Sequence, residues 1–315
     1  MSPRALITGC EGFVGTALTA HLASADWDVV GCGLAIDRDT PFRFRCDFRS
    51  ADSIREAISR AVGVTHVFHL AAMTFVPDTD KDPLAAYDTN LDGTIRLIET
   101  MQTLAPAARL VFVGSSEAYG VPQFLPITED HPLAPANPYA IGKAAADLHC
   151  AWAYRVTGAD IVRVRPFNHT GPGQSDRFAL PSFARQIAEI ECGLREPVLR
   201  VGNLDGARDF SHVTDMLRAY ERIALDGKPG AAYNVCSGHS VSLKSALDEM
   251  LGMAHARIGV TADPERYRPN EVPEICGSHA ALSSATGWRP EKSFRNLLED
   301  ILGYWRAHVA AGKAH

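Results

Sequence analysis

The chain has 315 residues, 46% of them hydrophobic and 22% charged, which is ordinary for a globular protein and excludes a disordered or collagen-like chain. Lys and Arg together number 31 and Asp and Glu number 37, so the formal net charge is −6, which argues against a nucleic-acid-binding surface. The seven cysteines include no CxxC pair and no apolar run reaches the ~18 residues of a membrane span, so we expect a cytoplasmic chain without membrane or nucleic-acid partners.

The first half of the chain alternates short apolar runs with longer segments of helical periodicity. We expect strands at 5–7, 28–32, 64–71, 109–114 and 160–165, and helices that begin near 13 or span 53–62, 83–103 and 139–156. Asp82 and Pro83 predict the start of the helix 83–103, as a capping carboxylate followed by a proline. The succession predicts an α/β fold with a Rossmann-type, doubly wound parallel sheet.

Beyond Pro166 the loops lengthen, which predicts a smaller C-terminal α/β domain that binds the substrate. We expect an NAD(P)-binding domain at 1–166 with returning segments at about 207–238, and a substrate domain formed by 167–206 and 239–315. A strand and a helix around 210–224, and a strand at 232–235, are expected to rejoin the main sheet.

Three glycines follow the first predicted strand. Gly9, Gly12 and Gly15 are spaced three apart in the segment TGCEGFVG at 8–15, which opens a helix. A dinucleotide pyrophosphate site needs this arrangement, because the turn is tight, the phosphates approach the backbone closely and the helix N-terminus points at them. The alternative is a plain glycine turn at a helix start; the position after the first strand favours the dinucleotide.

The end of the second predicted strand bears on the choice of dinucleotide. An acidic residue usually stands there to bind the adenosine ribose of NAD, but this chain has Cys32, Gly33 and Leu34. Arg38, a few residues later, could meet a 2′-phosphate or could be a solvated loop residue. We therefore expect NADPH or NADH, with NADPH favoured slightly.

A serine, a tyrosine and a lysine form a second constellation. Tyr139 and Lys143 are four residues apart, hence on one face of a predicted helix, and Ser115 ends a predicted strand. A phenol acts as acid or base near neutrality when a nearby ammonium lowers its pKa from ~10. The spacing alone is equally compatible with a surface tyrosine and a solvated lysine. The catalytic interpretation is favoured because the glycine loop is present in the same chain.

Taken together, these motifs resemble those of extended short-chain dehydrogenases/reductases that modify nucleotide sugars, and the resemblance covers nearly the whole chain. Its pieces are TGCEGFVG at 8–15, CDF at 46–48, HLAA at 69–72, SSEAYG at 115–120 and PYAIGK at 138–143. The resemblance implies a cofactor site made of Gly9, Gly12, Phe13, Gly15, Asp47, Phe48, Leu70, Ala71, Ala72, Asn90, Tyr139 and Lys143. Gly142 stands where the family usually has serine, a minor departure.

Within that family the implied roles differ along the chain. The glycines would hold the pyrophosphate, Asp47 and Phe48 would flank the adenine, and Asn90 would have a structural or relay role. Ser115 and Tyr139 would carry the proton chemistry, while Lys143 would bind the nicotinamide ribose.

The second half is similar to reductases that convert GDP-4-keto-6-deoxy-D-mannose to GDP-D-rhamnose. The matching segments are RPFNHTGPGQ at 165–174, GNLDGARDF at 202–210, YNVCSG at 233–238, DPERYRPNEVP at 263–273 and TGWRP at 286–290. The resemblance implies a GDP-sugar substrate bound by Ser116, Asn168, Arg208, Arg268 and Glu271. Two arginines suit a diphosphate, which they bind through charge-assisted hydrogen bonds.

Glu117 keeps a different reaction open. A carboxylate two places after the serine resembles that of GDP-mannose 4,6-dehydratases, where it removes a proton from C5. The segment 169–174 favours the reductase, in which the cofactor would deliver hydride to C4 and Tyr139 would act as general acid. Another nucleotide-sugar dehydratase or epimerase remains an alternative, as does a non-catalytic NAD(P)-binding regulator.

Two further expectations concern metals and partners. His66 and His69 lie three apart in a predicted strand and so on opposite faces, which excludes a shared metal ion, and we expect no metal site. The helices at 83–103 and from Tyr139 could form a four-helix interface in a homodimer, as in relatives.

Overall fold

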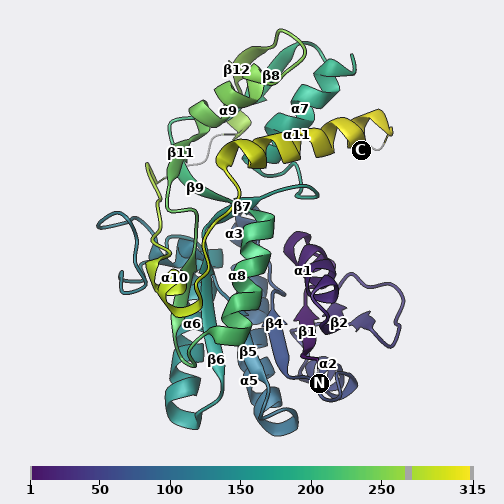
Figure 1. Cartoon of the computed structure of the whole chain (residues 1–315), viewed down its shortest axis with the longest axis vertical. Coiled ribbons are helices and arrows are strands. Elements are labelled where there is room, and N and C mark those ends of the chain that lie inside the picture. The colour runs from purple at the N-terminus through teal and green to yellow at the C-terminus, as the bar shows by residue number, and fades with distance from the viewer. Residues whose placement is uncertain (1, 267–271, 313–315) are drawn as a thin grey trace.

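The structure is a computed structural model that describes residues 2–266 and 272–312 (Figure 1). Its strands are β1 (Arg4–Thr8), β2 (Asp28–Gly33), β3 (Arg43–Arg45), β4 (His66–His69), β5 (Arg109–Val113), β6 (Ile161–Pro166), β7 (Asn168–Thr170), β8 (Val198–Val201), β9 (Ala207–His212), β10 (Ala232–Val235), β11 (Ser240–Ser242) and β12 (Gly259–Ala262). Its α-helices are α1 (Phe13–Ser24), α2 (Ala51–Arg60), α3 (Val76–Lys81), α4 (Pro83–Tyr87), α5 (Gly93–Leu104), α6 (Pro138–Thr157), α7 (Ala179–Glu191), α8 (Val213–Asp226), α9 (Leu243–Gly252), α10 (Ala280–Thr286) and α11 (Phe294–Ala310). A π-helical turn η1 (Asp88–Asp92) and the short 3-10 turns η2 (Ser116–Tyr119) and η3 (Pro264–Arg266) complete the set.

The main sheet has seven strands in the order β10-β6-β5-β4-β1-β2-β3. Every neighbouring pair in it is parallel. The chain winds outward from β1 in one direction through β2 and β3, and then in the other through β4, β5 and β6. This is the doubly wound Rossmann order, and ligands bind outside the carboxyl ends of the strands where the winding reverses, between β1 and β4.

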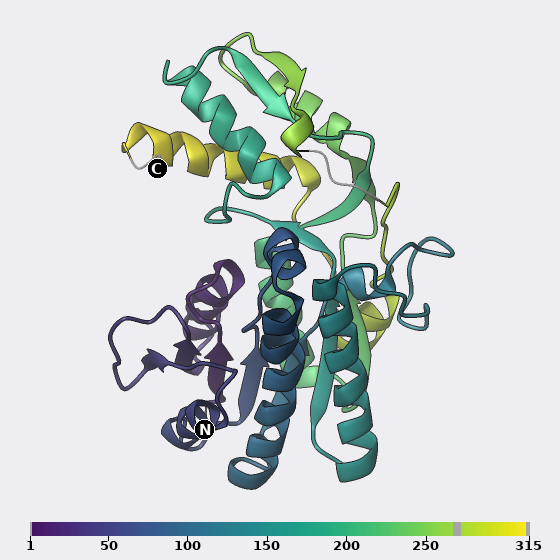
Figure 2. The same cartoon turned by 180° about the vertical axis from the view of Figure 1, so that it is seen from behind.

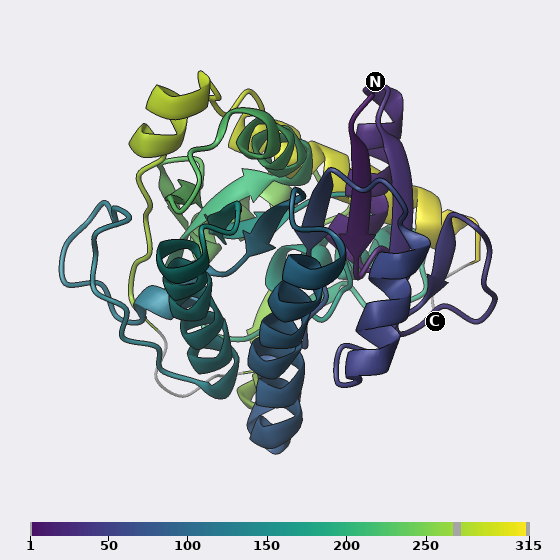
Figure 3. The ribbon, with the colours of Figure 1, turned by 90° about the horizontal axis from the view of Figure 1, so that it is seen from below.

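Helices cover both faces of this sheet because its strands are apolar on both sides. On one face Leu18 of α1 and Met216 of α8 pack with Val111 and Val162 of the strands. On the other face α2, α5 and α6 pack against Leu110 and its neighbours. Figure 1 shows α8 in front of the sheet, the view from behind in Figure 2 shows α5 and α6, and the view from below in Figure 3 shows the sheet between the two helix layers.

A smaller region caps the carboxyl edge of the sheet, at the top of Figure 1. Its helices α7, α9 and α11 bury an apolar cluster together with Leu199 and Val201 of β8, which pairs with β12 in a parallel two-stranded sheet. A three-stranded sheet of order β11-β9-β7 joins this region to the main one.

The predicted fold class is confirmed, with three local differences. The strand expected near residue 210 does not rejoin the main sheet: β9 lies in the three-stranded sheet, and only α8 and β10 return to the main one. The short edge strand β3 was not expected. The helix expected over 83–103 starts at Pro83 with Asp82 as its cap, but the π-helical turn η1 interrupts it. In the described part of the chain no helix is both long and apolar enough to cross a bilayer.

Candidate active site

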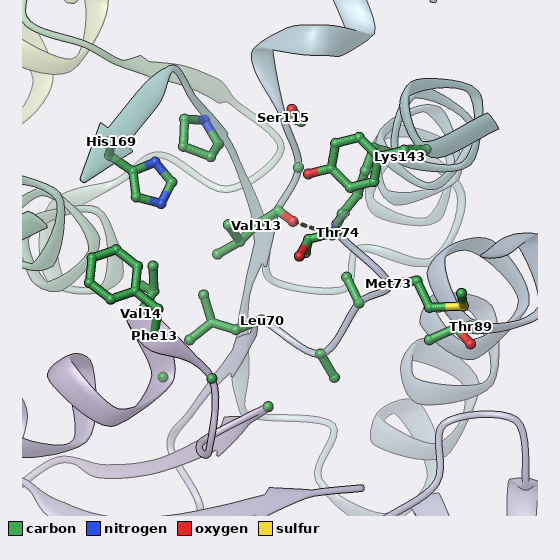
Figure 4. Close-up of a pocket in the computed structure, with 18 of the residues that line it drawn as sticks. Phe13, Val14, Leu70, Met73, Thr74, Thr89, Val113, Ser115, Lys143 and His169 are labelled. Carbon is green, nitrogen blue, oxygen red and sulfur yellow. Dashed lines mark hydrogen bonds between the residues drawn. The ribbon is translucent and has the colours of Figure 1, made fainter. Parts of the chain in front are cut away.

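A cleft of about 530 Å³ opens at the carboxyl edge of the main sheet, where the winding reverses. Its walls come from the glycine loop after β1, the segments that follow β3, β4, β5 and β6, and one face of α6. Figure 4 shows His169 and Phe13 on one side of it and Ser115 and Lys143 on the other. All predicted catalytic residues line the cleft: Ser115, Glu117, Tyr139 and Lys143.

The glycine loop has the geometry of a phosphate cradle. Gly9 has a φ of +67°, and a Cβ there would lie 3.0 Å from the backbone of Ala71, so a side chain would be both strained and crowded. A Cβ on Gly15 would overlap the carbonyl of Gly9 and lie 2.8 Å from Cys10 Cα. Gly12 is the N-cap of α1, and since it has no side chain it offers no side-chain hydrogen bond to the N–H groups of the first turn. The loop therefore brings backbone and free helical N–H groups to the cleft wall, which fits a pyrophosphate.

A buried hydrogen-bond chain holds the wall formed by Leu70 and Ala71. Thr8 Oγ1 accepts from both of their backbone N–H groups, at 3.1 and 3.0 Å, so its own proton points to His69 Nδ1 at 2.9 Å. Thr94 Oγ1 donates to the Asn90 carbonyl and is therefore the acceptor for His69 Nε2. Burial, with the nearby Lys143 charge, lowers the pKa of His69 to about 3, and the neutral ring is the form that this network needs.

Asn90 does not line the cleft, which differs from its implied place among the cofactor residues. It lies in the π-helical turn η1 and is buried. Its Oδ1 accepts from Met73 N at 2.8 Å and its Nδ2 donates to Met73 O at 3.0 Å. Asn90 thus fixes the loop after β4, whose residues Met73 and Thr74 do line the cleft.

The residues expected to flank the adenine lie in the wall of the cleft. Asp47 and Phe48 follow β3 and line the cleft, as do Leu70, Ala71 and Ala72 on the other side of the glycine loop. Arg49 donates to both carboxylate oxygens of Asp47, at 3.0 and 2.8 Å, and this hydrogen bonding lowers the pKa of Asp47.

Ser115 and Tyr139 meet from two different elements. Ser115 follows β5 and caps the turn η2, where its Oγ accepts from Glu117 N at 3.2 Å. Tyr139 stands in the first turn of α6. Burial raises the pKa of Tyr139 well above its ordinary value, the Glu117 carboxylate adds to the increase, and the Ser115 hydroxyl opposes it. The expected lowering of the tyrosine pKa is therefore wrong, and the phenol is held in its protonated form.

Lys143 explains part of this result. Its Nζ donates to the carbonyl of Val113 at 2.8 Å, the dashed bond in Figure 4, and lies 5.4 Å from the centre of the Phe112 ring. Burial lowers the pKa of Lys143 from 10.5 to about 8. The ammonium is thus turned to the end of β5, and the burial of the tyrosine outweighs any stabilisation of a phenolate.

Glu117 is tied to the helix that carries Tyr139. Its Oε2 accepts from Asn137 Nδ2 at 3.0 Å, and Asn137 Oδ1 accepts from Ala140 N at 2.8 Å as the cap of α6. One asparagine therefore orients the Glu117 carboxylate and caps α6, the helix that carries Tyr139.

The opposite wall carries the predicted Asn168 and residues that sequence reasoning did not single out. His169 stacks on Phe13, with 6.4 Å between ring centres, and burial lowers its pKa. Gln174 Nε2 donates to the carbonyl of His169 at 3.1 Å. Both residues belong to the segment 165–174 and could have been chosen there, whereas nothing in the sequence marks Tyr220 of α8, which also lines the cleft.

Of the remaining predicted substrate residues, one lines the cleft, one does not, and two lie outside the described residues. Ser116 lines the cleft, but Arg208 does not: its Nη1 donates to the carbonyls of Ala207 and Val272 at 2.9 and 2.8 Å. The structure therefore does not bring Arg208 to the cleft wall. Arg268 and Glu271 lie outside the described residues.

Comparison with known proteins agrees with this geometry. A family model described as GDP-mannose 4,6 dehydratase matches residues 6–301. The chain is 36% identical over 313 residues to the GDP-6-deoxy-D-mannose reductase of Pseudomonas aeruginosa, covering 98% of this chain and 99% of that one.

Two solved structures extend the comparison. The structure of RMD from Pseudomonas aeruginosa complexed with NADPH is similar with a TM-score of 0.87 and 35% identity, covering 98% of this chain and 100% of that one. The UDP-glucose 4-epimerase of Thermus thermophilus in complex with NAD gives a TM-score of 0.84 and 25% identity, covering 96% of this chain and 99% of that one. With a family match over residues 6–301, this chain is an enzyme of the GDP-mannose 4,6-dehydratase family, within the extended short-chain dehydrogenases/reductases.

Proposed function

We propose that the protein reduces the C4 keto group of GDP-4-keto-6-deoxy-D-mannose to give GDP-D-rhamnose, with NADPH or NADH as the reductant. The observation that carries the proposal is Tyr139 beside Ser115 in a cleft with a phosphate cradle. The 36% identity with a GDP-6-deoxy-D-mannose reductase over 98% of the chain supports a reductase.

Tyr139 acts as the general acid. Hydride addition to a carbonyl leaves negative charge on the oxygen, so the reaction needs a proton donor within hydrogen-bond reach. Burial and the Glu117 carboxylate keep the Tyr139 proton in place until that charge develops. Ser115 donates a second hydrogen bond to the same oxygen and orients the carbonyl.

The residues that would hold the dinucleotide are those of the cleft. The glycine loop and the N-terminus of α1 bind the pyrophosphate, Asp47 and Phe48 flank the adenine, and Lys143 binds the nicotinamide ribose. The cofactor supplies the hydride when bound. A relative of 35% identity has NADPH in its solved structure, and one of 25% identity has NAD.

The GDP-sugar would occupy the opposite wall. Asn168 on this wall, and Ser116 next to Ser115 on the facing wall, line the cleft and offer neutral hydrogen-bonding groups. We propose that Arg208 and Arg268 bind the diphosphate and Glu271 the ribose hydroxyls. For Arg208 this requires its guanidinium to leave the carbonyls of Ala207 and Val272.

GDP-mannose 4,6-dehydration is the second candidate, because Glu117 lines the cleft close enough to Tyr139 to act on its pKa. A dehydratase needs such a carboxylate to remove the C5 proton. In this chain, however, Asn137 already binds the Glu117 carboxylate, which leaves it less available as a base. This favours the reductase.

Two incubations separate the candidates. The protein is given GDP-mannose alone, and separately GDP-4-keto-6-deoxy-D-mannose with NADPH or NADH. We expect oxidation of the reduced cofactor only in the second incubation. Turnover of GDP-mannose without added reductant would assign the dehydratase, and inactivity in both would point to another nucleotide sugar or to a non-catalytic cofactor-binding protein.

We also propose a homodimer formed through α4, α5 and α6. One stripe of α6 exposes Ile141, Leu148 and Trp152, the last two at 58% and 48%, although large apolar side chains on one helical face normally pack against another surface. Replacing Trp152 with Glu should shift the mass measured by light scattering from dimer to monomer. An unchanged mass, or a wild-type monomer, would contradict this interface.

The cysteines support a cytoplasmic location. All seven are free thiols, and five of them are buried. Reducing compartments keep cysteines in this state.

A further inference from the structure

No acidic residue ends β2, but the structure places an acidic side chain from another segment at that point. In dinucleotide-binding sheets a carboxylate at this position receives the adenosine 2′-hydroxyl. Here the position is Gly33, the last residue of β2. A Cβ on Gly33 would overlap the carboxylate of Glu11, so the side chain of Glu11 fills the space that a residue-33 side chain would occupy.

The backbone holds Glu11 in this position through one carboxylate oxygen, and the other oxygen has no hydrogen-bond partner among the described residues. Glu11 belongs to the glycine loop and lines the cleft. Its Oε1 accepts from Ala35 N at 3.1 Å, which fixes the carboxylate over the end of β2. Its Oε2 is buried and, among the described residues, has no hydrogen-bond partner. A buried carboxylate oxygen without a donor is costly, which favours a turn of the carboxylate toward a hydrogen-bond donor of a ligand in the cleft that Glu11 lines.

Glu11 forms no ion pair among the described residues, although two arginines lie in this part of the molecule. Arg49 lines the same part of the cleft, but both of its hydrogen bonds to Asp47 engage its guanidinium. Burial raises the pKa of the Cys10 thiol and the Glu11 carboxylate adds to the increase, while Arg43 of β3 opposes it through its charge and a hydrogen bond to that thiol. A 2′-phosphate at the end of β2 would therefore meet the negative charge of Glu11 with no ion pair of Glu11 to weaken it among the described residues.

We propose that Glu11 sets the cofactor preference of this enzyme: its carboxylate accepts a hydrogen bond from the adenosine 2′-hydroxyl and repels a 2′-phosphate, so the cleft selects NADH over NADPH. This reverses the slight preference for NADPH that the sequence suggested, because the acid comes from the glycine loop and not from β2. The inference rests on the proposed function only in that the cleft takes a nicotinamide dinucleotide.

Equilibrium binding of NADH and NADPH, without sugar substrate, tests the proposal. Wild type should bind NADH at least ~10-fold more tightly than NADPH, since one charge-assisted hydrogen bond and one like-charge repulsion separate them. Glu11→Gln keeps the shape and removes the charge, so NADPH affinity should rise by ~10-fold or more, while NADH affinity should fall only about threefold because its hydrogen bond becomes a neutral one. Asp37→Asn, an exposed carboxylate of the loop after β2, removes the same net charge and should leave the ratio unchanged.

A second test moves the carboxylate from residue 11 to residue 33 and asks whether its position alone sets the preference. Gly33 is outside the left-handed region, and the three atoms nearest to a Cβ there all belong to Glu11, so shortening Glu11 removes these overlaps. The single variant Glu11→Ala should lose the NADH preference, and the double variant Glu11→Ala/Gly33→Asp should recover it. Adenosine 2′,5′-bisphosphate and AMP serve as fragment probes and should follow the same ratios.

Each result has one meaning. A wild type that binds NADPH as tightly as NADH, or a ratio that Glu11→Gln does not move, overturns the inference. Loss of the preference in Glu11→Ala that Gly33→Asp fails to restore, in a double variant with wild-type circular dichroism and NADH binding, also contradicts it. Failure of the wild type to bind either dinucleotide would instead contradict the proposed function.

Discussion

The main sheet with its helices and the capping region of α7, α9 and α11 are built on different cores. The capping core contains apolar side chains almost throughout, and its buried Gln186 pairs with the backbone of Arg200, joining α7 to β8. The sheet region buries ionisable groups: Lys143, Asp147 and Arg165 are 3%, 1% and 5% exposed. Burying charge is costly unless it is paired, so charges in a core indicate that something other than stability selects them.

The two regions therefore respond differently to mutation. In the sheet region, a polar substitution near the cleft should change chemistry and stability together. In the capping region, a comparable substitution should change stability alone. Four sets of substitutions can break or confirm this difference, beginning with the largest effect.

Replacing Tyr139 with Phe removes the proposed proton donor without changing the shape of the cleft. We expect the turnover number to fall by about 10³-fold, within the range for loss of a general acid, with cofactor affinity nearly unchanged. Tyr154→Phe, on the same helix but partly exposed on its outer side, is the matched control and should keep full turnover. Steady-state kinetics and cofactor titration measure both, and retained turnover in Tyr139→Phe would rule out the assignment.

Asp147 joins α6 to the sheet through two arginines. Its carboxylate accepts from Arg163 at 2.7 Å and from Arg165 at 3.0 and 2.8 Å. Asp147→Ala leaves the buried guanidinium of Arg165 and the partly buried one of Arg163 without their carboxylate partner, so the free energy of unfolding should fall by about 3–5 kcal/mol.

The control for that change is an exposed pair. Asp248 accepts from Lys244 at 2.7 Å on the surface of α9, and Asp248→Ala should change the free energy of unfolding by at most about 0.5 kcal/mol. Urea denaturation of both variants decides the matter. Similar losses in the two would show that the buried charges are no more important than surface ones.

Lys143 gives the sheet region a pH dependence with opposite signs for activity and stability. Its pKa is about 8 in the fold against 10.5 for an exposed lysine, so the unfolded chain binds more protons between these values and the Lys143 contribution to stability rises with pH. Activity that needs the ammonium should instead fall above pH about 8, by roughly tenfold per pH unit in kcat/KM.

The measurement compares wild type with Lys143→Met from pH 7 to 10. The difference in unfolding free energy between them should move in favour of wild type as pH rises. Lys244→Met, on the surface of α9, should leave both profiles as they are. A kcat/KM that stays flat up to pH 10 would contradict the role of Lys143.

Two helix N-caps, one in each region, provide the comparison with the smallest expected effect. Asn137 caps α6 and Ser293 caps α11, each accepting from a backbone N–H of the first turn at 2.8 and 3.1 Å. Replacing either with Ala should lower the free energy of unfolding by about 1 kcal/mol. Only Asn137→Ala should also alter turnover, because it releases Glu117 beside Tyr139. Equal effects on turnover would remove the distinction between the two regions.

Most of the fold was predictable from local sequence features. The apolar runs, the capping pair Asp82-Pro83 and the glycine spacing each reflect interactions within a few residues. The π-helical turn η1 was not predictable, because it places Asn90 against Met73, 17 residues earlier, and helical periodicity carries no record of that contact. The strand β9 was misplaced for a similar reason, since its neighbours β7 and β11 lie far from it in the chain.

The sequence by itself determined the doubly wound sheet, the phosphate cradle and the residues that meet at its carboxyl edge, because strand order and edge position follow from the βα repeat. Only the tertiary structure decided how those residues behave. Burial raises the pKa of Tyr139, and the Val113 carbonyl accepts a hydrogen bond from the Lys143 ammonium. The carboxylate of Glu11 lies at the end of β2. These outcomes depend on desolvation and on atoms brought together from distant segments, and residue spacing contains neither.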